Sequence, residues 1–270
     1  MTNRLFPALL KYWRDRRGLS QLDLSVESGV TARHLSFLES GRSKPSEEMV
    51  LRLLSLLRVP LRDQNHALRA DGFEHSFEEP PLDELYAEVT AALDQMLVQH
   101  EPYPMTVVAM DGAIVRMNAA APKVFGAFFA DPSALPDPPD MISMVFDPRL
   151  MRPFVVDWEA QAQLMVSRLH RERLERSGDE RIAWTLERAL SFPGVPREWR
   201  TPDFSREATP SMTVRLHRGN LRVGFLVTVT TFSAPQQVTL EELRIEAAFP
   251  LDDETRAVCA RLTAEVVGGT

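Results

Sequence analysis

The chain has 270 residues, of which 44% are hydrophobic and 26% are charged. This length favours two globular domains, and this composition excludes a mainly disordered chain. No apolar run approaches the roughly 20 residues that a membrane-spanning helix needs, and the first residues turn charged too early for a signal peptide. We therefore expect a cytoplasmic protein. The single cysteine, Cys259, excludes an internal disulfide framework and the zinc motifs built from several cysteines.

The charge is unevenly distributed along the chain. Residues 1–75 carry 12 Lys and Arg against 9 Asp and Glu, a net charge of +3, which leaves −10 for the rest of a chain whose total is −7. A surface that binds phosphates needs local positive potential, whereas an acidic remainder stays away from nucleic acid. The asymmetry favours a nucleic-acid-binding N-terminal domain but is too small to establish one alone.

Short helices separated by glycines are predicted for the first 75 residues. Leu10 and Trp13 lie at helical spacing before Gly18, whose missing Cβ permits a left-handed helix end. A second helix follows at once. Ser20 is placed to cap its free amides, and Asp23, three residues later, completes a shortened capping box.

A tight turn at Gly29 separates the second helix from a third. Thr31 is the predicted N-cap of this third helix, Leu35 and Leu38 share its buried face, and Gly41 closes it. The runs EEMVLRLLSLL and LRDQNHALRADG predict two further helices. Two short helices joined by a glycine-containing turn within a five-helix bundle form the architecture that presents one helix to the major groove of DNA.

The run GLSQLDLSVESGVTARHLSFLESGRSKPS resembles the phage-repressor-type (XRE) helix-turn-helix family. The resemblance covers a first domain that we place at residues 1–77, and it implies an all-α, λ-repressor-like five-helix bundle that binds double-stranded DNA. Arg14 and Glu39 match positions that resemble a structural ion pair between the first and third helices. The side chains that the resemblance places against DNA are Gln21, Thr31, Arg33, His34, Ser36, Phe37, Arg42 and Lys44.

These side chains would have different roles on DNA. The resemblance gives Gln21 a phosphate contact at a helix start, where free amides already favour anions, and it gives Arg42 and Lys44 backbone phosphates. Only Arg33 has an obvious base preference, the two acceptors of guanine. His34 is equally well interpreted as a solvated helix residue.

The Glu-Glu-Pro-Pro stretch at 78–81 marks the start of a second domain, which we place at residues 78–270. A helix is expected from Leu82 to about residue 100. Two apolar runs then surround Asp111-Gly112, a strong β-hairpin signal, and Asn118 follows as the cap of a small-residue helix. Strand, turn, strand, Asn and helix is how a PAS-like sensor domain opens.

The later part of this domain mixes helices and strands. Trp158, Met165 and Leu169 lie on the buried stripe of a long amphipathic helix, and Asp179 caps the next one. Three strands are predicted in MTVRLHRGN, LRVGFLVTVTTFS and VTLEELRIEAAFP, because apolar residues alternate and β-branched residues are frequent. A helix after Asp252 closes the chain.

The second domain resembles the MmyB-like ligand-binding domain, a PAS-related module, in HEPYPMTVV, VRMNAAA, MVFDPRLMRPFVVDWE, the VGFL that follows His217, and EAAFPLDDET. The resemblance implies an α+β domain with an antiparallel sheet and an apolar pocket for a fatty acid or a similar lipid-like molecule. Aromatic and Met residues at these spacings also build ordinary cores, and Arg152 is either the partner of a ligand carboxylate or a surface charge. The candidate pocket residues are Phe125, Phe128, Phe129, Met144, Phe146, Arg152, Trp158 and Phe225.

Catalytic and metal-binding motifs are missing from the sequence. The six histidines have no ligand spacing, and haem binding by His170 or His217 has no supporting pattern. We expect no enzyme and no metal or cofactor other than the apolar ligand. The leading hypothesis is a homodimeric, ligand-responsive transcription regulator at the nucleoid. The alternative is a second domain that only brings two DNA-binding domains together as a dimer, or recruits a partner protein, without a small-molecule signal.

Overall fold

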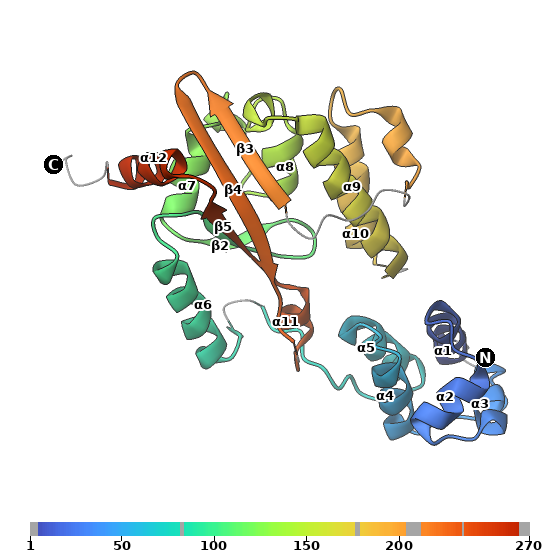
Figure 1. Ribbon diagram of the computed structural model, residues 1–270. Helices are drawn as coiled ribbons and strands as arrows, with labels where there is room; N and C mark the ends of the chain where they lie inside the picture. Colours follow the sequence, from blue (N-terminus) through green and yellow to red (C-terminus); the bar gives the residue numbers. More distant parts are fainter. Residues whose placement is uncertain (1–4, 82–83, 176–178, 204–211, 234, 265–270) are drawn as a thin grey trace. The chain divides into compact units, whose positions relative to one another are not determined.

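The computed structural model describes residues 5–81, 84–175, 179–203, 212–233 and 235–264 (Figure 1). The chain forms two compact units. The first unit extends to Pro81 and also includes Ser233–Glu241, whereas the second comprises Leu82–Phe232 and the residues from Glu242 onward. A short segment from the middle of the second domain's sequence therefore belongs to the N-terminal unit.

The first unit is built on the five predicted helices. The apolar stripes of these helices meet in one core, in which Leu10, Leu35 and Leu53 are fully buried and Trp13 is 2% exposed. This is the bundle that the spacing of the leucines predicted. The helices are α1 (Leu5–Arg16), α2 (Gln21–Ser28), α3 (Ala32–Glu39), α4 (Glu47–Leu56) and α5 (Leu61–Ala70).

The predicted helix ends of this unit are confirmed. The Ser20 hydroxyl accepts a hydrogen bond from the Asp23 amide at 3.1 Å, and the Asp23 carboxylate accepts one from the Ser20 amide at 2.8 Å, so the capping box is complete. Thr31 Oγ1 accepts from the His34 amide at 3.2 Å. Gly29 ends α2 with a φ of 67°, a left-handed conformation that glycine adopts without strain.

The second unit contains a five-stranded antiparallel sheet with the strand order β2-β1-β5-β4-β3. The predicted hairpin is confirmed: β1 and β2 pair on either side of Asp111-Gly112, and Gly112 has a φ of 88°. The strands are β1 (Met105–Val108), β2 (Ile114–Met117), β3 (Met212–Arg218), β4 (Leu221–Thr230) and β5 (Arg244–Pro250).

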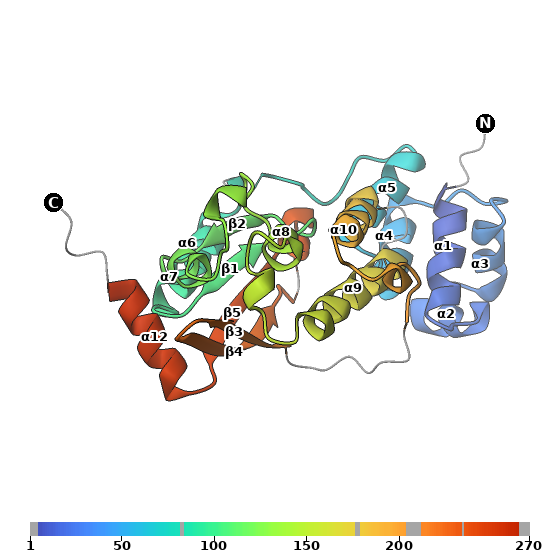
Figure 2. The same cartoon turned by 90° about the horizontal axis from the view of Figure 1, so that it is seen from above.

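Helices pack against this sheet in two groups. In one group, α7 and α12 lie side by side at one end of the sheet, and in the other, α9 and α10 run beside each other next to α8 (Figure 2). Asp179 caps α10 as predicted, through a bond from the Arg181 amide, whereas the N-cap residue of α7 is Ala119, and Asn118 just before it accepts a bond from the Ala121 amide. The helices of this unit are α6 (Ala87–Gln99), α7 (Ala120–Gly126), α8 (Met141–Phe146), α9 (Trp158–Glu175), α10 (Glu180–Ser191) and α12 (Asp253–Ala264), with short 3-10 turns at Pro132–Ala134, Arg152–Phe154 and Arg197–Arg200. Helix α11 (Val238–Glu242) belongs to the first unit, apart from its last residue.

Two sequence predictions need correction. The helix expected from Leu82 begins only at Ala87, and residues 82–83 lie outside the described residues. The strand predicted in VTLEELRIEAAFP begins only at Arg244, because Val238–Glu242 forms helix α11. The Glu241 amide donates to the Gln237 carbonyl at 3.2 Å, which closes a helical turn where the alternation of apolar and acidic residues imitated a strand.

In the part of the chain that the structure describes, no helix is both long and apolar enough to cross a bilayer.

Candidate nucleic-acid interface and apolar cavity

Helix α3 presents a polar face to solvent. Leu35 and Leu38 are fully buried in the core, so the opposite side of this eight-residue helix points away from it. Thr31, Arg33 and Ser36 are exposed on the outward side. The Arg33 guanidinium lies 5.6 Å from the centre of the half-buried Phe37 ring, close enough for a cation–π contact.

An ion pair connects α1 to the end of α3. Arg14 Nε donates to Glu39 Oε1 at 2.5 Å and its second terminal nitrogen donates to Glu39 Oε2 at 3.0 Å, which confirms the predicted pair. A third bond runs from Arg14 to the Leu19 carbonyl at 2.8 Å. The hydrogen bonds that Arg14 donates to Glu39 raise the pKa of Arg14. The pair is almost fully removed from solvent, so it sets the position of the outward helix.

Gln21 belongs to the same network. Its side-chain amide donates to Glu39 Oε2 at 2.8 Å, which holds the side chain at the first residue of α2. One amide hydrogen remains for an anion approaching this helix start. In the following loop, the Arg42 amide donates to the Phe37 carbonyl at 2.8 Å, and the side chains of Arg42 and Lys44 are exposed.

The eight predicted DNA-contacting residues therefore lie on α2, at the N-cap of α3, on α3 and in the loop after α3. Five of them are exposed, whereas Gln21, His34 and Phe37 are half-buried.

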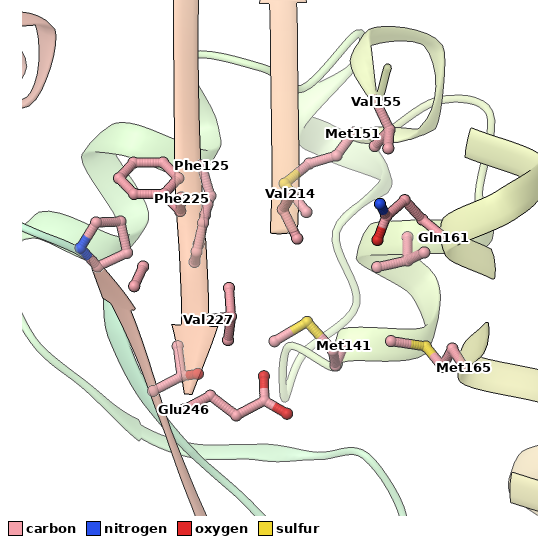
Figure 3. A pocket seen from close by; sticks show the side chains of 14 residues that line it. Phe125, Met141, Met151, Val155, Gln161, Met165, Val214, Phe225, Val227 and Glu246 are labelled. Atoms are coloured by element: carbon pink, nitrogen blue, oxygen red, sulfur yellow. The ribbon is translucent and has the colours of Figure 1, made fainter. Parts of the chain in front are cut away.

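The second unit encloses an apolar cavity of about 80 Å³ between one face of the sheet and helices α7 to α9 (Figure 3). The alternation of the strands places Val214, Val227 and Ala248 on this face, and three methionines form part of the opposite wall. The lining residues are Pro104, Thr106, Phe125, Met141, Val145, Met151, Val155, Gln161, Met165, Val214, Phe225, Val227, Glu246 and Ala248.

Two of the eight predicted pocket residues, Phe125 and Phe225, line this cavity. Phe128, Phe129 and Met144 are buried in the core that surrounds it without reaching the lining.

Phe146 and Trp158 lie in a separate core, where their rings meet edge to face at 6.0 Å. Arg152 also lies outside the lining. Its guanidinium donates to the Phe146 and Gly194 carbonyls, each at 3.2 Å, and stacks 3.6 Å from the centre of the Trp158 ring. Arg152 therefore stabilises a turn of the chain. It is neither a free surface charge nor a residue that lines the cavity.

The sequence interpretation missed the polar members of the cavity, Thr106 on β1, Gln161 on α9 and Glu246 on β5. Glu246 is 7% exposed, and burial raises the pKa of its carboxyl although Arg168 and Arg244 act in the opposite direction. A signal was present: in EAAFP, Glu246 and Ala248 share one strand face, so an inward Ala implies an inward Glu.

Cys259 is fully buried on α12, and burial raises the pKa of its thiol to about 11. The thiol is therefore protonated at neutral pH and unsuited to act as a nucleophile. Among the described residues, no three His, Cys, Asp or Glu side chains are grouped to hold a metal ion.

An outward helix on a five-helix unit, together with a sheet domain built around an apolar cavity, defines a DNA-binding transcription regulator with a ligand-binding domain. A helix-turn-helix family model matches residues 10–64, and the model of the MmyB-like transcription regulator ligand binding domain matches residues 89–262. Because the second match spans more than half of the chain, the protein belongs to the MmyB-like transcription regulators. Neither family is one of enzymes. No curated protein matches the sequence.

Proposed function

We propose that the protein is a homodimeric regulator that senses a small, mostly apolar molecule in the cavity of its second unit and changes its affinity for operator DNA in response. It would act at the nucleoid, in the cytoplasm. The observation that carries the proposal is a chain connection. Strands β4 and β5, which line the cavity, are joined by Ser233–Glu241, and this segment belongs to the DNA-binding unit.

The joining segment is attached to the first unit by specific bonds. The Val238 amide donates to the Glu78 carbonyl at 2.9 Å, and Thr239 Oγ1 donates to the Pro80 carbonyl at 2.6 Å. Val227 of β4 and Glu246 of β5 lie on the cavity side of this connection. A ligand that displaces either strand would therefore pull on a segment bound to the helix-turn-helix unit.

Such coupling requires that the ligand and the operator favour different arrangements, because a ligand that binds both arrangements equally shifts nothing. The geometry of DNA recognition supports a dimer in this proposal. One α3 helix reads only a few base pairs, and two heads spaced about one turn of DNA apart multiply the specificity. A change in the distance between the two helix-turn-helix units of the dimer is then enough to alter the affinity for the operator.

The size of the cavity restricts the ligand. Its volume of about 80 Å³ is smaller than the roughly 150 Å³ that holds benzene in an engineered cavity. A fatty-acyl chain, as the family resemblance implies, would enter only if wall residues moved. Met141, Met151 and Met165 are unbranched and can change rotamer at low cost.

The test combines mass spectrometry and DNA binding. A co-purifying molecule in gently isolated protein supports sensing. An operator duplex selected from random sequences is then titrated with the full chain, and Val227→Phe, which fills the cavity, is compared with Val229→Phe on the same strand. Val229 is 44% exposed and does not line the cavity. We expect Val227→Phe alone to change the affinity or to abolish its response to the ligand.

The alternative function would be favoured by two results together: a protein mass without any bound molecule, and equal operator affinities of wild type, Val227→Phe and Val229→Phe. The second unit would then serve as an assembly module without a small-molecule signal. The observation that favours this alternative is the small size of the cavity.

A further inference from the structure

Three polar side chains, Thr106, Gln161 and Glu246, line the cavity, and the side-chain oxygen of Gln161 has no hydrogen-bond partner among the described residues. Gln161 enters it from α9 and Glu246 from β5, with the Glu246 carboxylate pointing into the space beside Met141 (Figure 3). Gln161 Nε2 donates to the Thr213 carbonyl at 2.7 Å, which leaves Oε1 as the free acceptor. This oxygen is buried without a hydrogen bond. A buried polar atom of this kind is unfavourable unless another group satisfies it.

The charges around Glu246 already balance. Arg168 on α9 and Arg244 on β5 act on its carboxyl, and both are also close to Glu172, with nitrogen–oxygen distances of 3.6 Å and 2.8 Å. Two cations therefore face two carboxylates when Glu246 is ionised. In that state a charged ligand would disturb the balance in a site with little solvent, where an unpaired charge is costly.

A hydroxyl group fits both protonation states of Glu246. Burial raises the pKa of Glu246. A hydroxyl donates to the ionised carboxylate and accepts from the protonated one, and it can donate to Gln161 Oε1 in the second case. An ionised ligand carboxylate has no hydrogen to give to Gln161, whatever the state of Glu246.

We propose that the cavity recognises a neutral apolar molecule through a hydroxyl group that donates a hydrogen bond to Gln161 Oε1 and accepts one from the Glu246 carboxyl. This inference rests on the proposed function of the cavity as a ligand site. The apolar body of the ligand, an alkyl or aromatic group, packs among Phe125, Met141 and Met165. The recognised class is thus an apolar alcohol or phenol and not a fatty acid.

The experiment compares three probes with the same alkyl chain, decanol, decanoate and decylamine, each of which enters only when Met141, Met151 and Met165 change rotamer. The full chain is labelled at its methionine methyl groups, and the signals of Met141 and Met165, assigned by Met→Leu variants, report binding in the cavity by nuclear magnetic resonance. Decanol is expected to shift these signals saturably. Its affinity should be about tenfold higher than that of decanoate or decylamine, because each charged probe loses about one hydrogen bond's worth of binding free energy.

Variants test the two side chains. Gln161→Leu and Glu246→Met should each weaken decanol binding about fivefold. Glu246→Gln keeps a donor and the side-chain size, so it should bind decanol nearly as well as wild type and guards against a folding defect. Gln163→Leu is the matched control, because Gln163 lies on the same helix outside the lining.

The outcomes separate this inference from the proposed function. Tighter or equal binding of decanoate or decylamine overturns the hydroxyl assignment and leaves the cavity as a ligand site. Equal decanol affinity in Gln161→Leu, Glu246→Met and wild type overturns it as well. Should none of the probes shift the methyl signals, the hydroxyl assignment fails, whereas an effect of Val227→Phe on operator affinity would still support sensing.

Discussion

The side-chain carboxylate of Glu241 accepts a hydrogen bond at 3.0 Å from the backbone amide of Leu61, a residue 180 positions earlier in the chain. Leu61 begins α5, and Pro60 before it offers no side-chain cap. Glu241 therefore satisfies an amide that the helix leaves free, and its negative charge favours the helix N-terminus. The connection between two cavity strands thus completes a helix of the DNA-binding unit.

Replacing Glu241, which caps α5, should weaken this helix and also the coupling between the cavity and operator binding. Glu241→Ala is expected to lower the free energy of unfolding of the first unit by about 1 kcal/mol, measured by urea denaturation. Glu241→Gln keeps an acceptor oxygen and should lose less. In the Glu241→Ala background, the effect of Val227→Phe on operator affinity should shrink. If that effect kept its full size, the signal would not pass through Glu241.

Arg33 is predicted to read the operator. Its guanidinium is exposed on α3, on the side opposite the buried Leu35 and Leu38. Arg33→Ala should weaken binding to the selected operator by about 1–3 kcal/mol and relax the preference at one base pair, as measured by anisotropy on single-base variants. The control is Arg197→Ala, an exposed arginine of the second unit. An equal loss on every duplex would make Arg33 a phosphate contact.

Arg42 and Lys44 are predicted to contact phosphates. Both are exposed in the loop after α3, whose backbone is held by the bond from the Arg42 amide to the Phe37 carbonyl. Arg42→Ala and Lys44→Ala should weaken binding to all duplexes similarly, and each should reduce the slope of log affinity against log salt by about 1. An unchanged slope would place these side chains away from the DNA backbone.

Local signals in the sequence were enough to predict the first unit. The capping box of Ser20 and Asp23 and the buried spacing of Leu35 and Leu38 depend only on neighbours within one or two helical turns, so the sequence contains what determines them. The same holds for the Asp111-Gly112 hairpin, where two residues determine the turn.

The cavity and α11 depend on contacts between residues distant in sequence, and for this reason they were only partly predicted. Aromatic side chains such as Phe128 and Phe225 have the same pattern, yet only Phe225 reaches the empty space, because the packing of other elements decides where space remains. Likewise, Glu241 of α11 accepts a hydrogen bond from the Leu61 amide, and no local sequence pattern predicts that partner.

The ion pair of Arg14 and Glu39 offers a stability test. Their side chains are 9% and 5% exposed, so removing one partner leaves a buried charge uncompensated. Glu39→Ala should lower the free energy of unfolding by about 3–5 kcal/mol, whereas the double variant Arg14→Met, Glu39→Leu should lose much less, because an apolar pair of similar size often replaces a buried ion pair well. Chemical denaturation of the three proteins measures the difference. Equal losses in the single and double variants would show that the pair itself, and not an orphaned charge, is what matters.

Glu246 should make stability depend on pH in a defined direction. Burial raises its pKa in the folded state above the ordinary value of 4.5, with Arg168 and Arg244 opposing this effect. The folded protein therefore holds the proton more tightly than the unfolded chain, so the stabilising contribution is complete below pH 4.5 and is lost as the pH rises through the folded-state pKa. Glu246→Gln cannot ionise and keeps the neutral form at every pH. We expect its melting temperature to exceed that of wild type at neutral pH and the difference to decrease as the pH falls toward 4.5. A difference that stays constant over this range would mean that Glu246 has the same pKa folded and unfolded, and that its surroundings in the cavity do not disfavour its charge.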